Sequence, residues 1–154
     1  MVGNPEKAWV FRSSSFVRIA RDPDTIRLIC YDTMTTTEIA AQLVALCSEG
    51  RFLDAVKTLY TDNVVSVEAV DYQGLGREMH GKEAVLGKNV AWLDDNDVHS
   101  ISVTGPFVSP EKFALLYSFE WTRRASGERV KFTEVAVYTV VDGKIVHEEF
   151  LYGA

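Results

Sequence analysis

The residue of this sequence with the clearest chemical potential is Glu68. It stands in a run of mostly β-branched apolar residues, 64–70, which predicts a strand. Apolar surroundings raise the pKa of a carboxyl group toward neutrality, where the group can both take and return a proton. A second carboxylate nearby would raise one of the two pKa values further and divide the pair into an acid and a base. Glu120 and Glu134 are the candidates for that second carboxylate.

Histidine is the other side chain that commonly moves protons near neutral pH. His99 stands near the start of a strand predicted over 98–108, where it could serve a ligand as a donor or general base. An ordinary hydrogen bond at the surface is the alternative interpretation for His99. His80 precedes a predicted helix and is expected in a loop, and His147 is expected on the outer sheet face, in register with Ile145 and Glu149.

No metal or cofactor is implied by the sequence. The three aspartates of 94–97 indicate a solvated turn, because no histidine or further carboxylate stands at metal-loop spacing. The Gly-x-Gly at 74–76 lacks the flanking strand and helix of a nucleotide site. Cys30 and Cys47 form neither a disulfide framework nor a metal-ligand pattern, and Cys47 is expected as a small hydrophobic residue of a helix.

The composition is that of a soluble globular protein that binds neither nucleic acid nor membranes. The 154 residues are 47% hydrophobic and 25% charged, and the net charge of −6 disfavours a nucleic-acid or anionic-membrane surface. No apolar run approaches the roughly 20 residues that span a bilayer. We therefore expect a cytoplasmic protein with neither a nucleic-acid partner nor a membrane partner.

Three helices are predicted ahead of the long strands. Thr35 and Glu38 have the spacing of a capping box, and apolar residues at helical intervals follow until Gly50. A second apolar stripe indicates a helix over 52–60, and a third helix is predicted over 82–93.

Four strands are predicted after the helices, over 98–108, 112–124, 129–141 and 144–152. Short turn sequences separate them, so consecutive strands should pair in antiparallel hairpins. With the helices gathered before the strands, the pattern predicts an α+β domain whose helices pack on one sheet face.

Residues 1–33 differ from the rest of the chain. They carry four arginines and three consecutive serines, and show no sustained hydrophobic period. Arg18 interrupts the apolar run of 16–20 that a signal peptide would need. We expect 1–33 to be a poorly ordered or atypical extension, for which an upstream start in place of Met34 is one explanation, and 34–154 to be the domain.

The order of the elements resembles the nuclear transport factor 2-like superfamily, also called the cystatin-like cone fold, and most of all its SnoaL-like branch. The stretch 59–65 resembles the helix-to-strand corner of that family, 80–85 its third-helix entry and 138–146 its last hairpin. The resemblance covers 36–152. It implies three helices on a strongly curved antiparallel or mixed sheet that forms a cone, with a pocket for a small hydrophobic ligand or substrate as the partner. The family holds isomerases, cyclases, dehydratases and proteins without chemistry, so these motifs indicate the fold more than the activity.

The resemblance also implies which residues face the pocket. Glu68 falls where isomerase-like members carry their proton-abstracting carboxylate, and Glu120 falls near an acidic pocket residue of epoxide-hydrolase-like members. For Glu134 and Glu148, contact with solvent or with basic cross-strand partners is the favoured interpretation. The residues expected to contact a ligand are Tyr60, Ser66, Asn89, Trp92, Phe119, Trp121, Glu134, Tyr138, Phe150 and Tyr152. For Asn89, an edge position reaching water is an equally weighted alternative.

Two activities of the family are disfavoured by the residues present. Leu43 stands where ketosteroid isomerase-like members have an oxyanion-binding tyrosine, and Ala136 stands near the position of their second acid. Of the functional residues that the epoxide-hydrolase-like members carry, this sequence matches only one, through the acidic character of Glu120.

Two hypotheses of different classes follow. The first is an isomerase, cyclase or dehydratase in which Glu68, aided by Glu120 or His99, is the general base toward a hydrophobic carbonyl compound. The second is a non-catalytic module for ligand binding or dimerisation. The resemblance also implies a homodimer, formed through the outer sheet face.

Overall fold

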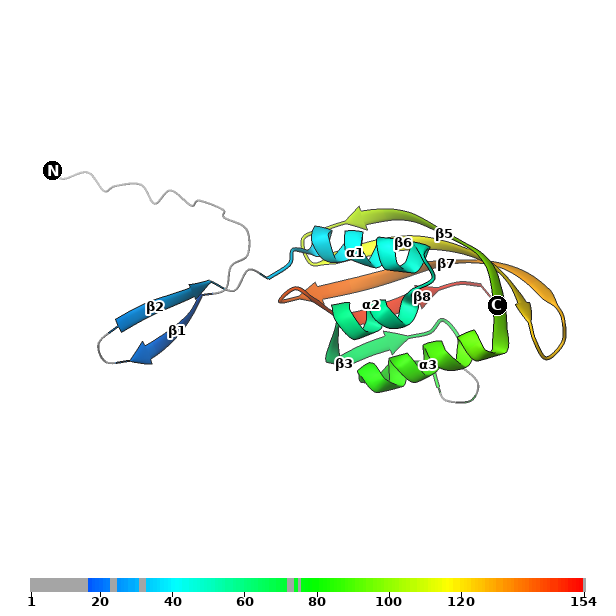
Figure 1. The fold of residues 1–154 in the computed structure, drawn as a ribbon, viewed down its shortest axis with the longest axis horizontal. Coiled ribbons are helices and arrows are strands. Elements are labelled where there is room, and N and C mark those ends of the chain that lie inside the picture. The colour runs from blue at the N-terminus through cyan, green and yellow to red at the C-terminus, as the bar shows by residue number, and fades with distance from the viewer. Residues whose placement is uncertain (1–16, 23–24, 31–32, 72–73, 75, 154) are drawn as a thin grey trace.

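A six-stranded mixed sheet with three helices on one face forms the main body of the protein (Figure 1). The computed structural model describes residues 17–22, 25–30, 33–71, 74 and 76–153. The helices are α1 (Thr36–Ser48), α2 (Phe52–Leu59) and α3 (Lys82–Asp95). The strands of the sheet are β3 (Tyr60–Val67), β4 (Glu78–His80), β5 (Asn96–Val108), β6 (Lys112–Arg123), β7 (Arg129–Val141) and β8 (Lys144–Leu151).

The strands lie in the order β4-β3-β8-β7-β6-β5. Strands β5 to β8 form the predicted antiparallel hairpins, whereas β3 and β8 pair in parallel. Along the chain, β3 is followed by β4, α3 and the hairpins of β5 to β8, and the last strand, β8, lies beside β3. This arrangement confirms the α+β class and the mixed sheet with three helices. The short strand β4 was not predicted.

The start of α1 is fixed by the predicted capping box. The Thr35 backbone N–H donates to Glu38 Oε2 at 2.7 Å, and the Glu38 N–H donates to Thr35 Oγ1 at 3.3 Å. These contacts satisfy backbone donors that have no partner inside the helix. The Thr35 N–H and the Thr35 hydroxyl both donate to Glu38 Oε2 and lower the pKa of Glu38.

The turn between β7 and β8 requires glycine. Asp142 and Gly143 have φ values of 50° and 70°, the left-handed pair that suits a two-residue hairpin. A Cβ atom at Gly143 would lie 2.9 Å from the Met34 backbone nitrogen. The last hairpin thus lies directly against the residue with which the expected domain begins.

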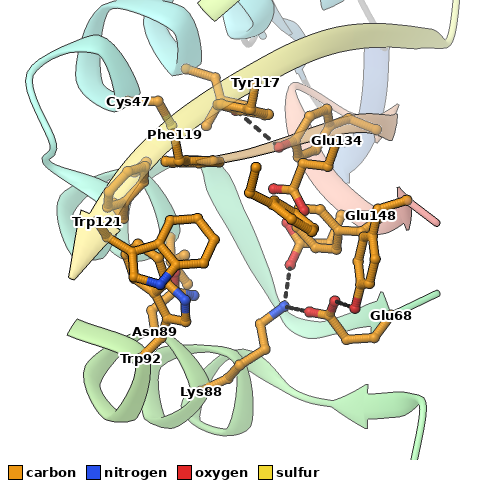
Figure 2. A pocket seen from close by; sticks show the side chains of 18 of the residues that line it. Cys47, Glu68, Lys88, Asn89, Trp92, Tyr117, Phe119, Trp121, Glu134 and Glu148 are labelled. Carbon is orange, nitrogen blue, oxygen red and sulfur yellow. Dashed lines mark hydrogen bonds and ion pairs between the residues drawn. The ribbon is translucent and has the colours of Figure 1, made fainter. Parts of the chain in front are cut away.

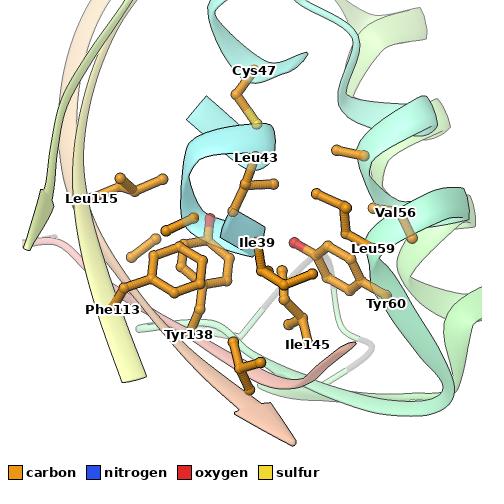
Figure 3. Packing of buried hydrophobic residues seen from close by; sticks show 14 of the residues in the cluster. Ile39, Leu43, Cys47, Val56, Leu59, Tyr60, Phe113, Leu115, Tyr138 and Ile145 are labelled. Atoms are coloured by element: carbon orange, nitrogen blue, oxygen red, sulfur yellow. The ribbon is translucent and has the colours of Figure 1, made fainter. Parts of the chain in front are cut away.

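Apolar residues of α1 and α2 pack on the inward side chains of β6 to β8 (Figure 3). Ile39 and Leu43 of α1 meet Phe113 of β6 and Tyr138 of β7, whose rings stack at a centroid distance of 4.8 Å. Cys47, in α1, is buried with them, as expected for a small hydrophobic residue. This core holds the helices against the sheet.

The pairing of β7 with β8 contains a register shift between Thr139 and Val140. Because of this irregularity, Ile145 is fully buried, although strict alternation with His147 and Glu149 placed it on the outer face. The expectation for Ile145 was wrong because a one-residue shift exchanges the two faces of a strand.

Ahead of the main body, β1 (Val17–Asp22) and β2 (Thr25–Cys30) pair in an antiparallel hairpin. The sequence indicated no regular element in this stretch. Of the other residues of the expected extension, 1–16, 23–24 and 31–32 lie outside the described part of the chain. In the described residues, no helix is long and apolar enough to cross a membrane. The cytoplasmic location stays a prediction.

Candidate functional site

A cavity of about 280 Å³ lies between the helices and the inner face of the sheet (Figure 2). Its volume is close to the lower end of the range for small-molecule sites. All three helices and strands β6 to β8 contribute to its wall. Ten residues expected from the sequence to contact a ligand or transfer a proton lie in this wall: Tyr60, Glu68, Asn89, Trp92, Phe119, Trp121, Glu134, Tyr138, Phe150 and Tyr152.

Strand alternation explains how β6 and β7 supply so much of the wall. Tyr117 pairs with Glu134, Phe119 with Phe132 and Trp121 with Val130, and all six side chains line the cavity. Residues two apart along a strand point to the same face, so the three cross-strand pairs form successive rows along the wall.

One side of the cavity is aromatic. Trp92 of α3 meets the edge of Trp121 at a centroid distance of 5.4 Å and Phe119 at 5.9 Å. Phe132 joins this group, 5.6 Å from Trp121, and lies 5.2 Å from Tyr152. Edge-to-face packing of this kind stabilises rings in fixed orientations, so this side offers a rigid apolar surface.

The other side is charged and centres on Lys88 of α3 (Figure 2). The Lys88 ammonium group donates to Glu68 Oε1 at 2.7 Å and to Ser66 Oγ at 2.9 Å, and lies 3.6 Å from Glu148 Oε1. The side chains of Lys88, Glu68 and Glu148 are only 8%, 9% and 2% exposed. Burial alone would lower the pKa of Lys88, but the charges of Glu148 and Glu68 outweigh it and raise that pKa.

Two tyrosines complete the hydrogen bonding of these carboxylates. The Tyr60 hydroxyl donates to Glu148 Oε2 at 2.6 Å, and the Tyr152 hydroxyl donates to Glu68 Oε2 at 2.9 Å. Burial, followed by the charge of Glu148, raises the pKa of Tyr60, which keeps it a donor. Both oxygens of Glu68 are therefore occupied by protein donors.

Glu134 differs from its neighbours because its carboxyl group has no hydrogen bond or ion pair with any described residue. It lies in the cavity wall, on the side of Glu68 and Lys88. Burial, followed by the charge of Glu68, raises the pKa of Glu134 from 4.5 to about 7, while Lys88 opposes the shift. A free carboxyl group that titrates near neutrality can act as both acid and base.

A second hydrogen-bonded group lies deeper in the wall. The hydroxyls of Tyr117 and Tyr138 are 3.1 Å apart, and both tyrosines are buried. Burial raises the pKa of Cys47 beside them to about 11, so its thiol stays neutral.

Three predicted site residues do not line the cavity. Glu120 alternates with Phe119 and Trp121 on β6, so it faces outward, where Arg129 donates to it at 2.7 Å and lowers its pKa. The exposed His99 ring lies 2.7 Å from the Thr122 hydroxyl. Ser66 is fully buried and meets Lys88. The structure therefore does not bring Glu120 or His99 together with Glu68.

The solvent-facing interpretation of Glu134 and Glu148 is corrected by the structure. Glu134 lines the cavity because it shares the inward face of β7 with Phe132. Glu148 is buried because it shares the inward face of β8 with Phe150. The basic partner that makes the burial of Glu148 tolerable is Lys88, which sequence reasoning missed. A signal was present, since Lys88 stands three residues after Val85 and four before Trp92, on the apolar face of α3.

The arrangement suits a small organic compound with an apolar body and a polar group. Among the described residues, no group of three or more histidine, cysteine, aspartate or glutamate side chains could hold a metal ion. Asn89, also in the wall, uses its Nδ2 to donate to the Val85 carbonyl at 2.8 Å.

Known structures share this fold. A candidate SnoaL-like polyketide cyclase from Mesorhizobium loti is 40% identical, with a TM-score of 0.72 over 77% of this chain and 100% of its own. A protein of unknown function with a cystatin-like fold, from Xanthomonas campestris, has a TM-score of 0.67 at 18% identity, over 79% of this chain and 92% of its own. A candidate polyketide cyclase from Pseudomonas putida has a TM-score of 0.59 at 17% identity, over 78% and 92%. The latter two show likeness of fold alone.

Comparison by sequence agrees with the structures. No protein with curated annotation matches the chain. The family model of the SnoaL-like domain matches residues 34–152, which is the segment that holds the sheet, the helices and the cavity. The chain therefore belongs to the SnoaL-like domain family.

Proposed function

We propose that this protein is a proton-transfer enzyme of the isomerase, cyclase or dehydratase type, acting on a hydrophobic carbonyl compound. The observation that carries the proposal is the Glu134 carboxyl group, which has no hydrogen-bond partner among the residues that the structure describes. It lies in a largely aromatic cavity beside the Lys88–Glu68 ion pair. A carboxylate pair of this kind was expected from the sequence, with Glu68 as the base.

The geometry favours different roles for the two carboxylates. Glu68 accepts from Lys88 and Tyr152 with its two oxygens, so it has little capacity left for a substrate proton. Glu134 accepts no hydrogen bond from the described part of the chain, and its pKa of about 7 matches a group that takes and returns protons at neutral pH. In this proposal Glu134 is the proton carrier, and the charge of Glu68 helps to raise its pKa.

The proposed reaction begins when the Glu134 carboxylate removes a proton from the carbon next to the substrate carbonyl. The electron pair of the broken C–H bond moves toward the carbonyl oxygen and gives an enolate. Lys88, on the same side of the cavity, supplies positive charge that stabilises this oxygen. Protonated Glu134 then returns the proton to a carbon atom of the enolate. Alternatively, the enolate carbon attacks the carbon of a second carbonyl group, the π bond of that group breaks to give an alkoxide, and the alkoxide takes the proton from Glu134.

The relatives support a carbonyl substrate. The Mesorhizobium loti protein, 40% identical, is a candidate SnoaL-like polyketide cyclase. A polyketide carries ketone groups, and the carbon atoms next to a ketone lose protons readily, so such a substrate would suit proton transfer. The aromatic side formed by Trp92, Phe119 and Trp121 supports an apolar substrate body.

The test is catalysed exchange of protons next to a ketone. The bicyclic aromatic ketone 2-tetralone is incubated in D₂O with the protein, and loss of its proton signal is followed by NMR. The unmodified protein should accelerate exchange over buffer, and Glu134→Gln should lower the catalysed rate by a factor on the order of 10² to 10⁴. Glu149→Gln, which removes a carboxylate of β8 outside the cavity wall, is the matched control and should keep the full rate.

The outcomes separate the two hypotheses. An unchanged rate in Glu134→Gln would remove Glu134 from the chemistry. If the unmodified protein gives no acceleration with 2-tetralone or with open-chain aromatic ketones, the proton-transfer proposal fails and the non-catalytic ligand-binding module is favoured.

A further inference from the structure

The charged side of the cavity holds three carboxylates and one ammonium group. Glu68, Glu134 and Glu148 all line the cavity, and Lys88 is the cation among them. Among the described residues of the wall, Arg123 is the one further cation, and its exposed side chain pairs with Glu128 at 3.5 Å. Since Lys88 already contacts Glu68 and Glu148, the negative charge of Glu134 is not balanced by a partner within the described residues.

We infer that the compound bound by this cavity carries a positively charged nitrogen, an organic ammonium group, next to its apolar body. A buried charge without a partner is costly, and a ligand cation placed beside Glu134 would remove that cost. An anionic ligand would meet the same surplus of negative charge and be disfavoured.

Lys88 shows how the cavity stabilises an ammonium group. Its nitrogen lies 4.5 Å from the centroid of the Phe150 ring and donates hydrogen bonds to Glu68 and Ser66. Rings attract cations through their negative faces, so an aromatic face together with a carboxylate forms a suitable cation site. Around Glu134 the same components recur, because its strand also presents Phe132, which packs against Trp121 and Tyr152. The Glu134 carboxylate and the Phe132 ring thus resemble the group around Lys88, but the described residues place no further ammonium group between them.

The groups around Glu134 determine how binding depends on pH. Glu68 faces it from the end of β3, Lys88 from α3, and Glu148 and Tyr152 from β8 and the residue beyond it. Strand β6 presents Tyr117 opposite Glu134 and Arg123 farther along the wall. The two neighbouring carboxylates favour protonation of Glu134, and a ligand cation would favour its ionised form. Binding of a cation should therefore release a proton and strengthen as pH rises through about 7.

This inference rests on the proposed function in using the same cavity and the same Glu134, and it names the class of substrate. A cation beside Glu134 would also increase the fraction of ionised base at neutral pH and stabilise an enolate. Ligand binding is measured without turnover, so either proposal can fail while the other stands.

The test compares three probes with one aromatic ring each: benzyltrimethylammonium, 2-phenylethanol and phenylacetate, titrated by calorimetry. At about pH 8 the cation should bind roughly tenfold or more tightly than the neutral alcohol, and phenylacetate should bind most weakly. Benzyltrimethylammonium does not titrate, so its affinity should weaken by about tenfold between about pH 8 and pH 6 through Glu134 alone. Titrations in two buffers of different ionisation enthalpy should show proton release.

Variants locate the effect. Glu134→Gln should weaken the cation by roughly tenfold or more, remove the pH dependence and leave 2-phenylethanol unchanged, whereas Glu149→Gln should behave as the unmodified protein. Equal affinity for the cation and the alcohol at about pH 8, or no detectable cation binding at millimolar concentration, would overturn the inference. So would a Glu134→Gln variant with full cation affinity. If that variant does not fold, the probe comparison on the unmodified protein decides alone.

Discussion

The Lys88 ammonium group lies 2.7 Å from the Glu68 carboxylate, and the two side chains are only 8% and 9% exposed. Lys88 joins the middle of α3 to the end of β3 across the interior of the protein, and Glu148 of β8 completes the group at 3.6 Å. A buried ion pair stabilises little relative to an apolar core, but removal of one partner leaves a buried charge alone.

Replacing Lys88 should therefore destabilise the protein strongly. Lys88→Met leaves Glu68 and Glu148 without their cation, and we expect a loss of about 3–5 kcal/mol in the free energy of unfolding, measured by urea denaturation at neutral pH. Lowering the pH should recover part of the loss, since protonation removes the unpaired charge. Lys82→Met on the same helix is the matched control, because its pair with the exposed Asp62 lies at the surface. A loss in Lys88→Met no larger than in Lys82→Met would contradict the buried pair.

Glu134 should make stability depend on pH in an unusual direction. Its pKa is raised to about 7 in the folded protein from an ordinary 4.5, so between these values the folded state binds more protons than the unfolded state. The contribution of Glu134 is thus fully present below about pH 4.5 and is lost as pH rises through about 7. Relative to the unmodified protein, Glu134→Gln should gain stability progressively between about pH 5 and pH 8, with thermal unfolding as the readout and Glu149→Gln as background. A difference that stays constant over this range would count against a raised pKa.

The two tyrosines that donate to the carboxylates should differ in their contribution. Tyr60→Phe removes a buried 2.6 Å hydrogen bond to Glu148, and we expect a loss of about 1–3 kcal/mol in unfolding free energy. Tyr152→Phe removes the 2.9 Å hydrogen bond to Glu68 at a partly exposed position, where water can replace the lost donor. Urea denaturation of both variants under one condition should therefore rank Tyr60→Phe as the less stable. The reverse order would show that water reaches Glu148 more easily than Glu68.

The outer face of the sheet carries an apolar row that supports the expected homodimer. Leu116, Val135 and Leu151 stand opposite one another on β6, β7 and β8, and Leu151 is 49% exposed. We propose that a second copy of the chain covers this row, and we expect a dimer in light scattering at micromolar concentration. Leu151→Lys should shift the protein toward the monomer, whereas Val90→Lys, at a valine of α3 with 42% exposure, should not. An unmodified protein that is monomeric would contradict the proposed interface.

Much of the fold was predictable because local patterns and the global arrangement agree. The capping box at Thr35, the helical apolar stripes and the Asp142–Gly143 turn each predicted an element that the structure contains. Strand β4 was missed because its three residues are too few for a period to be visible. The parallel pairing of β3 with β8 joins segments about eighty residues apart in the sequence, and short-range patterns carry no information about such a contact.

Site residues were predictable where strand alternation alone determines which face a side chain takes. They were not predictable where the burial of a side chain depends on a partner from another helix or strand. Alternation places Phe119, Trp121 and Tyr138 in the cavity wall. It also places Glu120 on the opposite face, once it is known which face of β6 points inward. The burial of Glu148 depends on Lys88. The place of Lys88 on the apolar face of α3 was a local signal of its burial, but a helical lysine is usually solvated, and no local pattern indicated which carboxylate it would meet.

The ionisation of Glu134 is the central claim, and its carboxyl carbon reports it directly. The protein is labelled with ¹³C at glutamate carboxyl groups, the Glu134 signal is assigned by its absence from the Glu134→Gln spectrum, and its chemical shift is followed from about pH 4 to pH 9. A midpoint near 7 is the result expected from the burial of Glu134 beside Glu68. A midpoint near the ordinary value of 4.5 would contradict both its role as proton carrier and the uptake of a cation coupled to its ionisation.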